Sequence, residues 1–177
     1  MTDESPALAI SLLTDAFTRV SQALPTLLEG MAVPELLWRP DSAANSIAWL
    51  TWHLARVQDD HLAGIGGIAQ VWVTGGWATR FALPYPESAI GYGQNADEVA
   101  AFNVTDPALL LGYHQATHDL TLAVLADMTT SDFQRVVDTR WDPPVTAAVR
   151  LVSVVNDITA HVGQIGYVRG LIERRAQ

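Results

Sequence analysis

Two side chains in the last third of the chain could do chemistry together. Asp157 and His161 lie four residues apart, in a segment whose apolar residues recur at helical spacing. Those apolar residues are Leu151, Val154, Val155, Ile158, Ile165 and Val168. Because side chains four apart on a helix stack on one face, the pair is expected at or beside the protein interior. A buried carboxylate without a partner is costly, so something must compensate Asp157.

The residue types leave two interpretations of this pair open. In the first, Asp157 and His161 satisfy each other through a hydrogen bond, or an arginine pairs with the carboxylate, since structural ion pairs also occupy such positions. In the second, the carboxylate and the imidazole are two ligands of one divalent cation. Paired histidines use the same helical spacing in zinc proteases.

A third ligand is available from an earlier helical segment. His53 lies on a largely apolar helix face, with Trp49 and Trp52 close by in sequence. A lone histidine on such a face is more often a core residue than a ligand, but Asp157 and His161 need a partner of this kind. Two histidines and one carboxylate leave coordination positions open for water or substrate, which is typical of a catalytic metal site.

The other histidines and acidic residues are weaker candidates. His114 and His118 are also four apart and form a rival metal pair, but their polar neighbours in sequence predict a solvated helix face. His61 lies about 12 Å along the helix axis from the histidine at position 53, too far to share its cation. Asp59 and Asp60 are expected at a solvated helix end.

Four long helices are predicted to position these residues. They run from about Pro6 to Glu29, from Asn45-Ser46 to about Gly64, from Pro107 to about Met128, and from about Val145 to Arg174. Capping residues and prolines mark their beginnings, and a glycine cluster ends the second. Pro25 is expected to break or kink the first. A short helical turn is expected at 131–135 and an extended segment at 136–141. The fold class is therefore all-α, a four-helix bundle.

The connection from Ala69 to Asn103 is long, lacks periodicity, and combines aromatic residues with glycines and prolines. Such a connection inside a compact domain usually has a function. Its aromatic residues would either form the wall or lid of a pocket or close one end of the bundle. Both interpretations remain open.

The composition excludes several classes of function. The chain has 177 residues, which suits one domain over 1–177, and its 19 acidic and 10 basic residues give a net charge of -9. We expect no nucleic-acid partner, because this charge repels phosphate. The lack of cysteine excludes disulfides, thiolate ligands and a cysteine nucleophile. An acidic N-terminus without a following membrane-length apolar run predicts a cytoplasmic protein with no membrane partner.

Several short segments resemble one known family. The second-helix region of DinB-like proteins is similar to LWRP at 37–40, NSIAWL at 45–50 and WHLA at 52–55. The run AHVGQI at 160–165 resembles the family's fourth-helix signature, a ligand histidine followed by Gly-Gln. The segment between VW at 71–72 and GYG at 91–93, with VRG at 168–170, resembles an actinobacterial branch. That branch groups mycothiol-dependent transferases with maleylpyruvate isomerase.

This resemblance implies a bundle with crossed connectivity and a divalent metal, commonly zinc or nickel, in its core. It carries the ligand positions over to His53, Asp157 and His161. Many members have histidine at the position of Asp157, and the isomerase branch has glutamate. Aspartate is one methylene shorter than glutamate, so its reach to the metal is a departure from the family pattern. The isomerase has a further C-terminal domain that this sequence does not contain, which favours the single-domain S-transferases.

The implied activity is a metal-dependent S-transfer that detoxifies electrophiles. A low-molecular-weight thiol, mycothiol, would bind the open metal site through sulfur, and the resulting thiolate would attack an electrophilic substrate. Trp49 or Trp52 would form a wall with the aromatic connection. Gln164 would orient a ligand or substrate, or only make a polar contact. Arg169 would pair with a substrate carboxylate or form an interhelical ion pair.

Two other functions are compatible with the same residues. A metal-dependent hydrolase would use the same site with a water-derived nucleophile and no thiol. A non-catalytic stress-response module would use a metal, if any, only for structure. Bundles of this type often self-associate, so a homodimer is expected by analogy.

Overall fold

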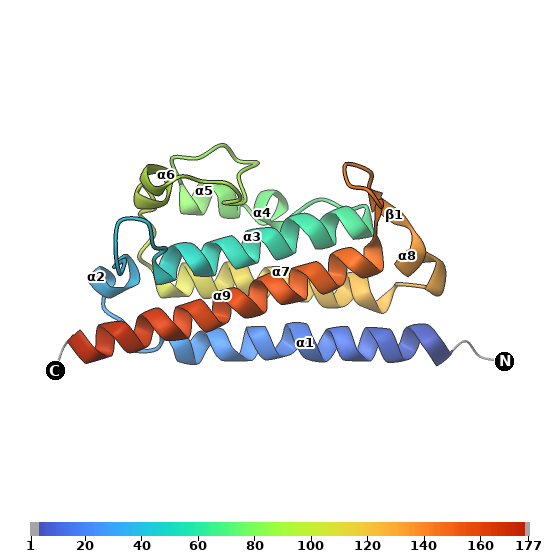
Figure 1. Ribbon diagram of the computed structural model, residues 1–177, viewed down its shortest axis with the longest axis horizontal. Coiled ribbons are helices and arrows are strands. Elements are labelled where there is room, and N and C mark those ends of the chain that lie inside the picture. The colour runs from blue at the N-terminus through green and yellow to red at the C-terminus, as the bar shows by residue number, and fades with distance from the viewer. Residues whose placement is uncertain (1–3, 176–177) are drawn as a thin grey trace.

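The computed structural model describes residues 4–175, and four long helices form its bundle (Figure 1). They are α1 (Glu4–Leu28), α3 (Ile47–Gly66), α7 (Pro107–Ala126) and α9 (Ala147–Arg175). Both α1 and α3 pack against α7 and α9, so α1 and α3 lie on one diagonal of the bundle. Two of the three long connections therefore join diagonal helices. The expected all-α bundle is confirmed.

The helix boundaries follow from local capping. The Ser46 hydroxyl accepts a hydrogen bond from the backbone N–H of Trp49 at 3.2 Å and begins α3. The Asp106 carboxylate accepts a hydrogen bond from the backbone N–H of Ala108 and begins α7. Helix α1 continues through Pro25 to Leu28, so the expected break at this proline does not occur. Leu24 and Leu28 are both buried on either side of the proline, and this packing offsets the lost backbone hydrogen bond. None of the helices in residues 4–175 is both long and apolar enough to cross a membrane.

Short elements fill the connections. They are α2 (Val33–Leu36), α4 (Val71–Thr74), α5 (Trp77–Phe81), α6 (Ala96–Ala100), α8 (Thr130–Gln134), β1 (Val136–Asp138) and β2 (Val145–Thr146). The two strands pair antiparallel, with Asp138 opposite Val145. The fourth helix thus begins two residues later than expected, because residues 145–146 complete this hairpin. The hairpin places β1 close to the beginning of α9 (Figure 1), where Asp138 accepts a hydrogen bond from Arg150.

The connection between α3 and α7 lies over α3, on the side away from α1 (Figure 1). Its aromatic residues pack on Trp52, whose ring centroid is 6.5 Å from Trp72, 5.5 Å from Tyr85 and 5.6 Å from Phe102. Trp52, Trp72 and Phe102 are buried. These aromatic residues extend the hydrophobic core, while Tyr92, on the same connection, is 85% exposed beside a cavity. The connection therefore packs along the side of α3, and its Tyr92 lines the cavity.

Asp59 is fully buried, which corrects the expectation of a solvated helix end. Its carboxylate accepts hydrogen bonds from the backbone N–H groups of Val71 and Trp72 at 3.0 and 2.8 Å, and from the Tyr113 hydroxyl at 2.9 Å. Arg56 Nη1 lies 3.6 Å away. Burial raises the pKa of Asp59, and these hydrogen bonds offset the increase only in part. The carboxylate therefore ties α4 and α7 to α3.

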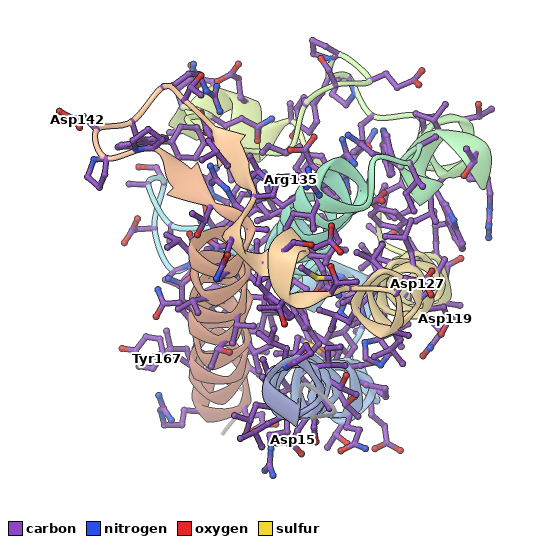
Figure 2. All side chains as sticks on the ribbon, turned by 90° about the vertical axis from the view of Figure 1, so that its right-hand side faces the viewer. Asp15, Asp119, Asp127, Arg135, Asp142 and Tyr167 are labelled. Atoms are coloured by element: carbon purple, nitrogen blue, oxygen red, sulfur yellow. The ribbon has the colours of Figure 1, made fainter. Side chains whose placement is uncertain are left out.

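We predict that Asp59→Ala lowers the free energy of unfolding by about 3–5 kcal/mol, because it leaves the buried Arg56 guanidinium without its counterion. Urea denaturation measures the change. The matched control is Asp15→Ala, since Asp15 projects from the outer face of α1 in an exposed ion pair with Arg19 (Figure 2). The control is expected to change stability by about 0–1 kcal/mol. Equal losses in the two variants would contradict the structural role of Asp59.

Candidate metal centre

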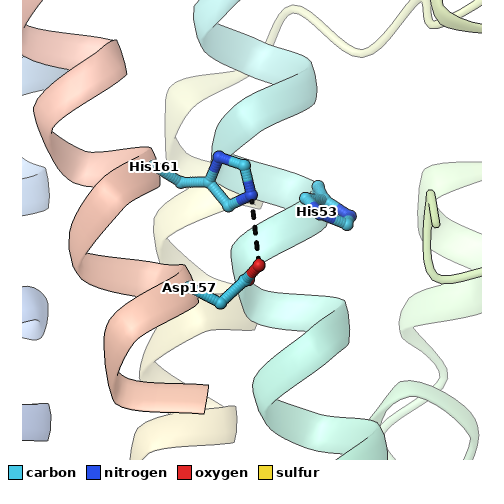
Figure 3. Close-up of side chains that lie close together, drawn as sticks. All are labelled: His53, Asp157 and His161. Carbon is cyan, nitrogen blue, oxygen red and sulfur yellow. Dashed lines mark ion pairs between the residues drawn. The ribbon is translucent and has the colours of Figure 1, made fainter. Parts of the chain in front are cut away.

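Three side chains from two helices meet at the contact between α3 and α9. His53 extends from α3, and Asp157 and His161 extend from α9 (Figure 3). One ligand atom from each lies within 4.8 Å of the others. Asp157 Oδ1 is 3.6 Å from His161 Nε2, and the two imidazole centroids are 4.8 Å apart. The structure brings together the three residues that the sequence singled out.

Each imidazole is held by a carbonyl oxygen at its Nδ1. His53 Nδ1 lies 2.5 Å from the backbone oxygen of Ile90, and His161 Nδ1 lies 2.8 Å from Oε1 of Gln164. Because a carbonyl oxygen only accepts, Nδ1 donates in both contacts, and in the neutral ring Nε2 keeps its lone pair. Metal-ligating histidines characteristically donate their other N–H in this way. Both rings therefore present Nε2 as a ligand atom.

The Asp157 carboxylate is not satisfied by the protein. Its Oδ2 is buried and has no hydrogen-bond partner in residues 4–175, and the 3.6 Å from Oδ1 to His161 exceeds a hydrogen bond. No arginine of the described chain pairs with it, so the simple ion-pair interpretation leaves this oxygen unexplained. A cation bound between the three residues would compensate it, and the side-chain types fit a divalent metal.

The protonation states also suit a cation. Burial lowers the pKa of His53, so its imidazole is neutral at pH 7. Burial alone would raise the pKa of Asp157, but the surrounding histidines, His161 first, bring it below its ordinary value. Burial would lower the pKa of His161, but its contacts with Asp157 and Gln164 raise it. An ionised carboxylate beside a neutral imidazole is the state that binds metal.

The connection between α3 and α7 fixes the His53 ring from outside. Trp49 stacks on it with centroids 4.6 Å apart, and the Trp49 indole N–H donates to Gln94 at 2.8 Å. Gly91 has φ of +90°, and a Cβ there would lie 2.6 Å from His53 Nδ1. Only glycine allows the backbone to approach so closely with this φ. Nothing in the sequence pattern identified the Ile90 contact, since its partner is a main-chain oxygen.

A cavity of about 620 Å³ opens beside the metal group. His53 and Asp157 line one part of it, and charged and aromatic residues of α9 and the hairpin line another. These include Asp138, Arg140, Trp141 and Arg150. The cavity gives a small molecule access to two of the three candidate ligands.

A family model described as the DinB superfamily matches residues 16–165. The chain belongs to the DinB superfamily. A crystal structure described as the conserved protein of locus from Enterococcus faecalis is similar to it, with 31% sequence identity and a TM-score of 0.84. The match covers 90% of this chain and 94% of the other. A comparison with curated proteins found no match. DinB superfamily proteins bind divalent metals, so His53, Asp157 and His161 are a candidate site of the kind that the superfamily uses.

The remaining candidate residues of this DinB superfamily member lie at different distances from the metal group. The Gln164 side chain contacts His161, one of the three candidate ligands. Trp52 packs edge-on against Trp49, 6.2 Å between centroids, within the core. Arg169 donates to Glu173 at 2.8 Å and to the backbone oxygen of Thr26 at 2.6 Å. The structure therefore uses Arg169 to join α9 to α1 and does not bring it to the metal group.

His114 and His118 are buried, at 2% and 6% exposure, which corrects the expected solvated face. Their parallel rings are 6.4 Å apart between centroids. The polar neighbours on the same face are also buried, and Thr121 accepts a hydrogen bond from Gln58 of α3 at 2.7 Å. This face of α7 is a polar layer inside the bundle. In residues 4–175 it offers no group of three candidate metal ligands.

We predict that wild-type protein binds one divalent cation, and that His53→Ala or Asp157→Ala lowers the affinity at least about 100-fold, because each removes a ligand. Gln164→Ala removes only the acceptor for His161 and is expected to lower affinity about 10- to 100-fold. Isothermal titration with zinc or nickel measures these changes. The control is His61→Ala, about 12 Å along α3 from His53, which is expected to have little effect. Unchanged affinity in the first two variants would exclude this site.

We predict that stability falls on acidification partly through His114. Burial lowers the pKa of His114 to about 3, whereas the unfolded chain has an ordinary value near 6.5. The unfolded state therefore binds more protons below pH 6.5, and folding loses up to about 1.4 kcal/mol per pH unit from this group. His114→Gln should flatten the dependence of the unfolding free energy between pH 7 and 4. Parallel curves for wild type and variant would contradict this.

Proposed function

We propose that the protein is a metal-dependent S-transferase that uses a low-molecular-weight thiol to attack an electrophilic small molecule. The observation that carries the proposal is the Asp157 carboxylate, which has a buried Oδ2 without a partner and lies close to two imidazoles beside an open cavity. Mycothiol is the thiol that the motif resemblance indicates, and zinc or nickel the metal.

The number of ligands supports a catalytic site over a structural one. Structural zinc sites are closed by four protein ligands, whereas catalytic sites have three and keep a position for substrate. The described chain supplies three, His53, Asp157 and His161. The absence of cysteine agrees with a sulfur that arrives with a substrate.

The charge of the group supports an anionic nucleophile. Two neutral imidazoles and one carboxylate with a divalent cation would carry a net charge of about +1. When bound, such a cation favours thiolate over thiol at neutral pH. Ile90 and Gln164 hold the two Nε2 atoms in place, and Trp49 prevents rotation of the His53 ring. Residues of the chain thus fix the geometry before the thiol enters.

We predict that metal-loaded protein accelerates the reaction of 1-chloro-2,4-dinitrobenzene with mycothiol above the spontaneous rate, and that metal-free protein does not. The sulfur–carbon bond forms, the carbon–chlorine bond breaks, and chloride and the thiol proton leave to solvent. His161→Ala should lower the rate at least about 100-fold through loss of a metal ligand. Arg19→Gln, on the outer face of α1, should leave it unchanged.

The same assay separates the alternatives. A panel of ester and amide substrates without thiol tests the hydrolase, since hydrolysis of any of them that requires the metal and is lost in His161→Ala would favour a hydrolase. Stoichiometric metal without turnover of any substrate would favour a non-catalytic binding module. Either outcome would reject the S-transferase.

A further inference from the structure

The α9 face that carries the metal group continues toward the hairpin. Arg150, Val154, Asp157 and His161 are spaced by four, three and four residues, so they share one face of the helix. Arg150 lies about 10 Å along the helix axis from Asp157. Both residues line the same 620 Å³ cavity. Arg150 and the metal group are thus two turns apart on α9 and share one cavity.

The Arg150 side chain is held in place but has donors to spare. It is 16% exposed, and its Nη2 donates to Asp138 Oδ2 at 2.8 Å. This is the one hydrogen bond that its side chain makes within residues 4–175. Because a guanidinium carries five N–H donors in a planar fork, most of them remain available to a ligand in the cavity.

Asp138 positions this guanidinium. Its side chain is 7% exposed on β1, and it also accepts two hydrogen bonds from the Arg140 guanidinium, at 3.0 and 2.9 Å, and one from the Arg140 backbone N–H at 3.0 Å. These hydrogen bonds hold the pKa of Asp138 well below its ordinary range. The Arg140 side chain is 83% exposed, and its guanidinium pairs with the Asp138 carboxylate. Two guanidinium groups around this one carboxylate leave a local net charge of +1. Both arginines line the cavity, and Arg150 has more of its donors free, because it uses only Nη2 on Asp138 while Arg140 uses Nε and Nη2.

Asp60 is a second carboxylate at this end of the cavity, but within residues 4–175 it forms no ion pair with Arg150. Asp60 accepts a hydrogen bond from the Gln70 amide at 2.7 Å and lies 3.5 Å from His61. Burial and then the charge of Arg150 lower the pKa of His61, so its ring is neutral at pH 7. A planar anion in the cavity would therefore meet a preorganised cation.

We propose that Arg150 binds a carboxylate of the substrate, about 10 Å from the atom that reacts at the metal group. The substrate class is then a carboxylic acid whose reactive end is separated from the acid by a chain of about eight bonds. Exposed aromatic walls at Tyr92 and Trp141 are available to the chain between them. The identity of the reacting atom rests on the proposed S-transfer, but recognition of the carboxylate does not.

The first test is equilibrium binding of octanoate and of 1-octanol to metal-free protein. Wild type should prefer octanoate at least about tenfold, as a charge-assisted pair requires. Arg150→Gln should abolish the preference without weakening octanol binding. Arg150→Lys should retain part of it, because the charge remains but the fork is lost. Arg19→Gln is the matched control with full preference.

The ratio of the two affinities distinguishes recognition from a structural role. If Arg150 only joined α9 to the hairpin, Arg150→Gln would change thermal stability but not the octanoate-to-octanol ratio. The same ratio in wild type and Arg150→Gln, or no preference in wild type, would overturn the proposal. Asp138→Asn should also reduce the ratio, because Arg150 would lose its fixed position.

The second test locates the carboxylate on one of the two reactants. Metal-loaded protein is given 8-mercaptooctanoate or 8-mercapto-1-octanol with a neutral electrophile, and then a neutral thiol with a carboxylated or neutral maleimide. An Arg150-dependent preference in the first pair assigns the carboxylate to the thiol, and in the second pair to the electrophile. If no thiol reacts while octanoate preference persists, S-transfer fails and the anion site stands. If thiols react without any Arg150-dependent preference, the carboxylate site is rejected and S-transfer stands.

Discussion

The geometry of the metal centre depends on the contact between α3 and α9, which places a carboxylate with an unpartnered oxygen against a neutral imidazole. A buried oxygen of this kind destabilises the folded state unless a ligand satisfies it. The surrounding residues do not relieve it. Ile90 and Gln164 instead contact the Nδ1 atoms, and His161 Nε2 lies 3.6 Å from Asp157 Oδ1. One ligand atom of each residue lies within 4.8 Å of the others, which fits a shared divalent cation.

The central position of α3 explains why the side chains at the contact between α3 and α9 are held in place. Residues 46 to 59 are all buried, because α7, α9 and the connection after α3 cover the helix on every side. Polar residues on α3 must therefore find partners inside the bundle. Arg56 and Asp59 do so with Tyr113, and Gln58 does so with Thr121. His53 belongs to the same helix and gains its fixed orientation from the same confinement.

Sequence periodicity predicted the four helices and the shared face of Asp157 and His161, because both depend on spacing within a helix. His53 was added because this pair needs a partner and because the DinB resemblance implies it. Periodicity failed where a polar residue is buried by a distant segment. Asp59 looked like a helix end because its partners, Val71 and Trp72, lie after a glycine-rich turn. His114 looked solvated because α7 is polar on a face that α3 happens to cover. Arg150 was not singled out, since its partner Asp138 comes from a hairpin whose register the sequence did not specify.

Ile90 contributes to two properties through different parts of the residue, namely the orientation of the His53 ring and the lining of the cavity. The main-chain oxygen of Ile90 holds the imidazole, while the same residue lines the cavity. A different side chain at position 90 would change the shape of the cavity but keep the carbonyl that fixes the ring. Substitution of the Ile90 side chain can thus change which molecules the cavity admits while the orientation of the His53 imidazole is kept.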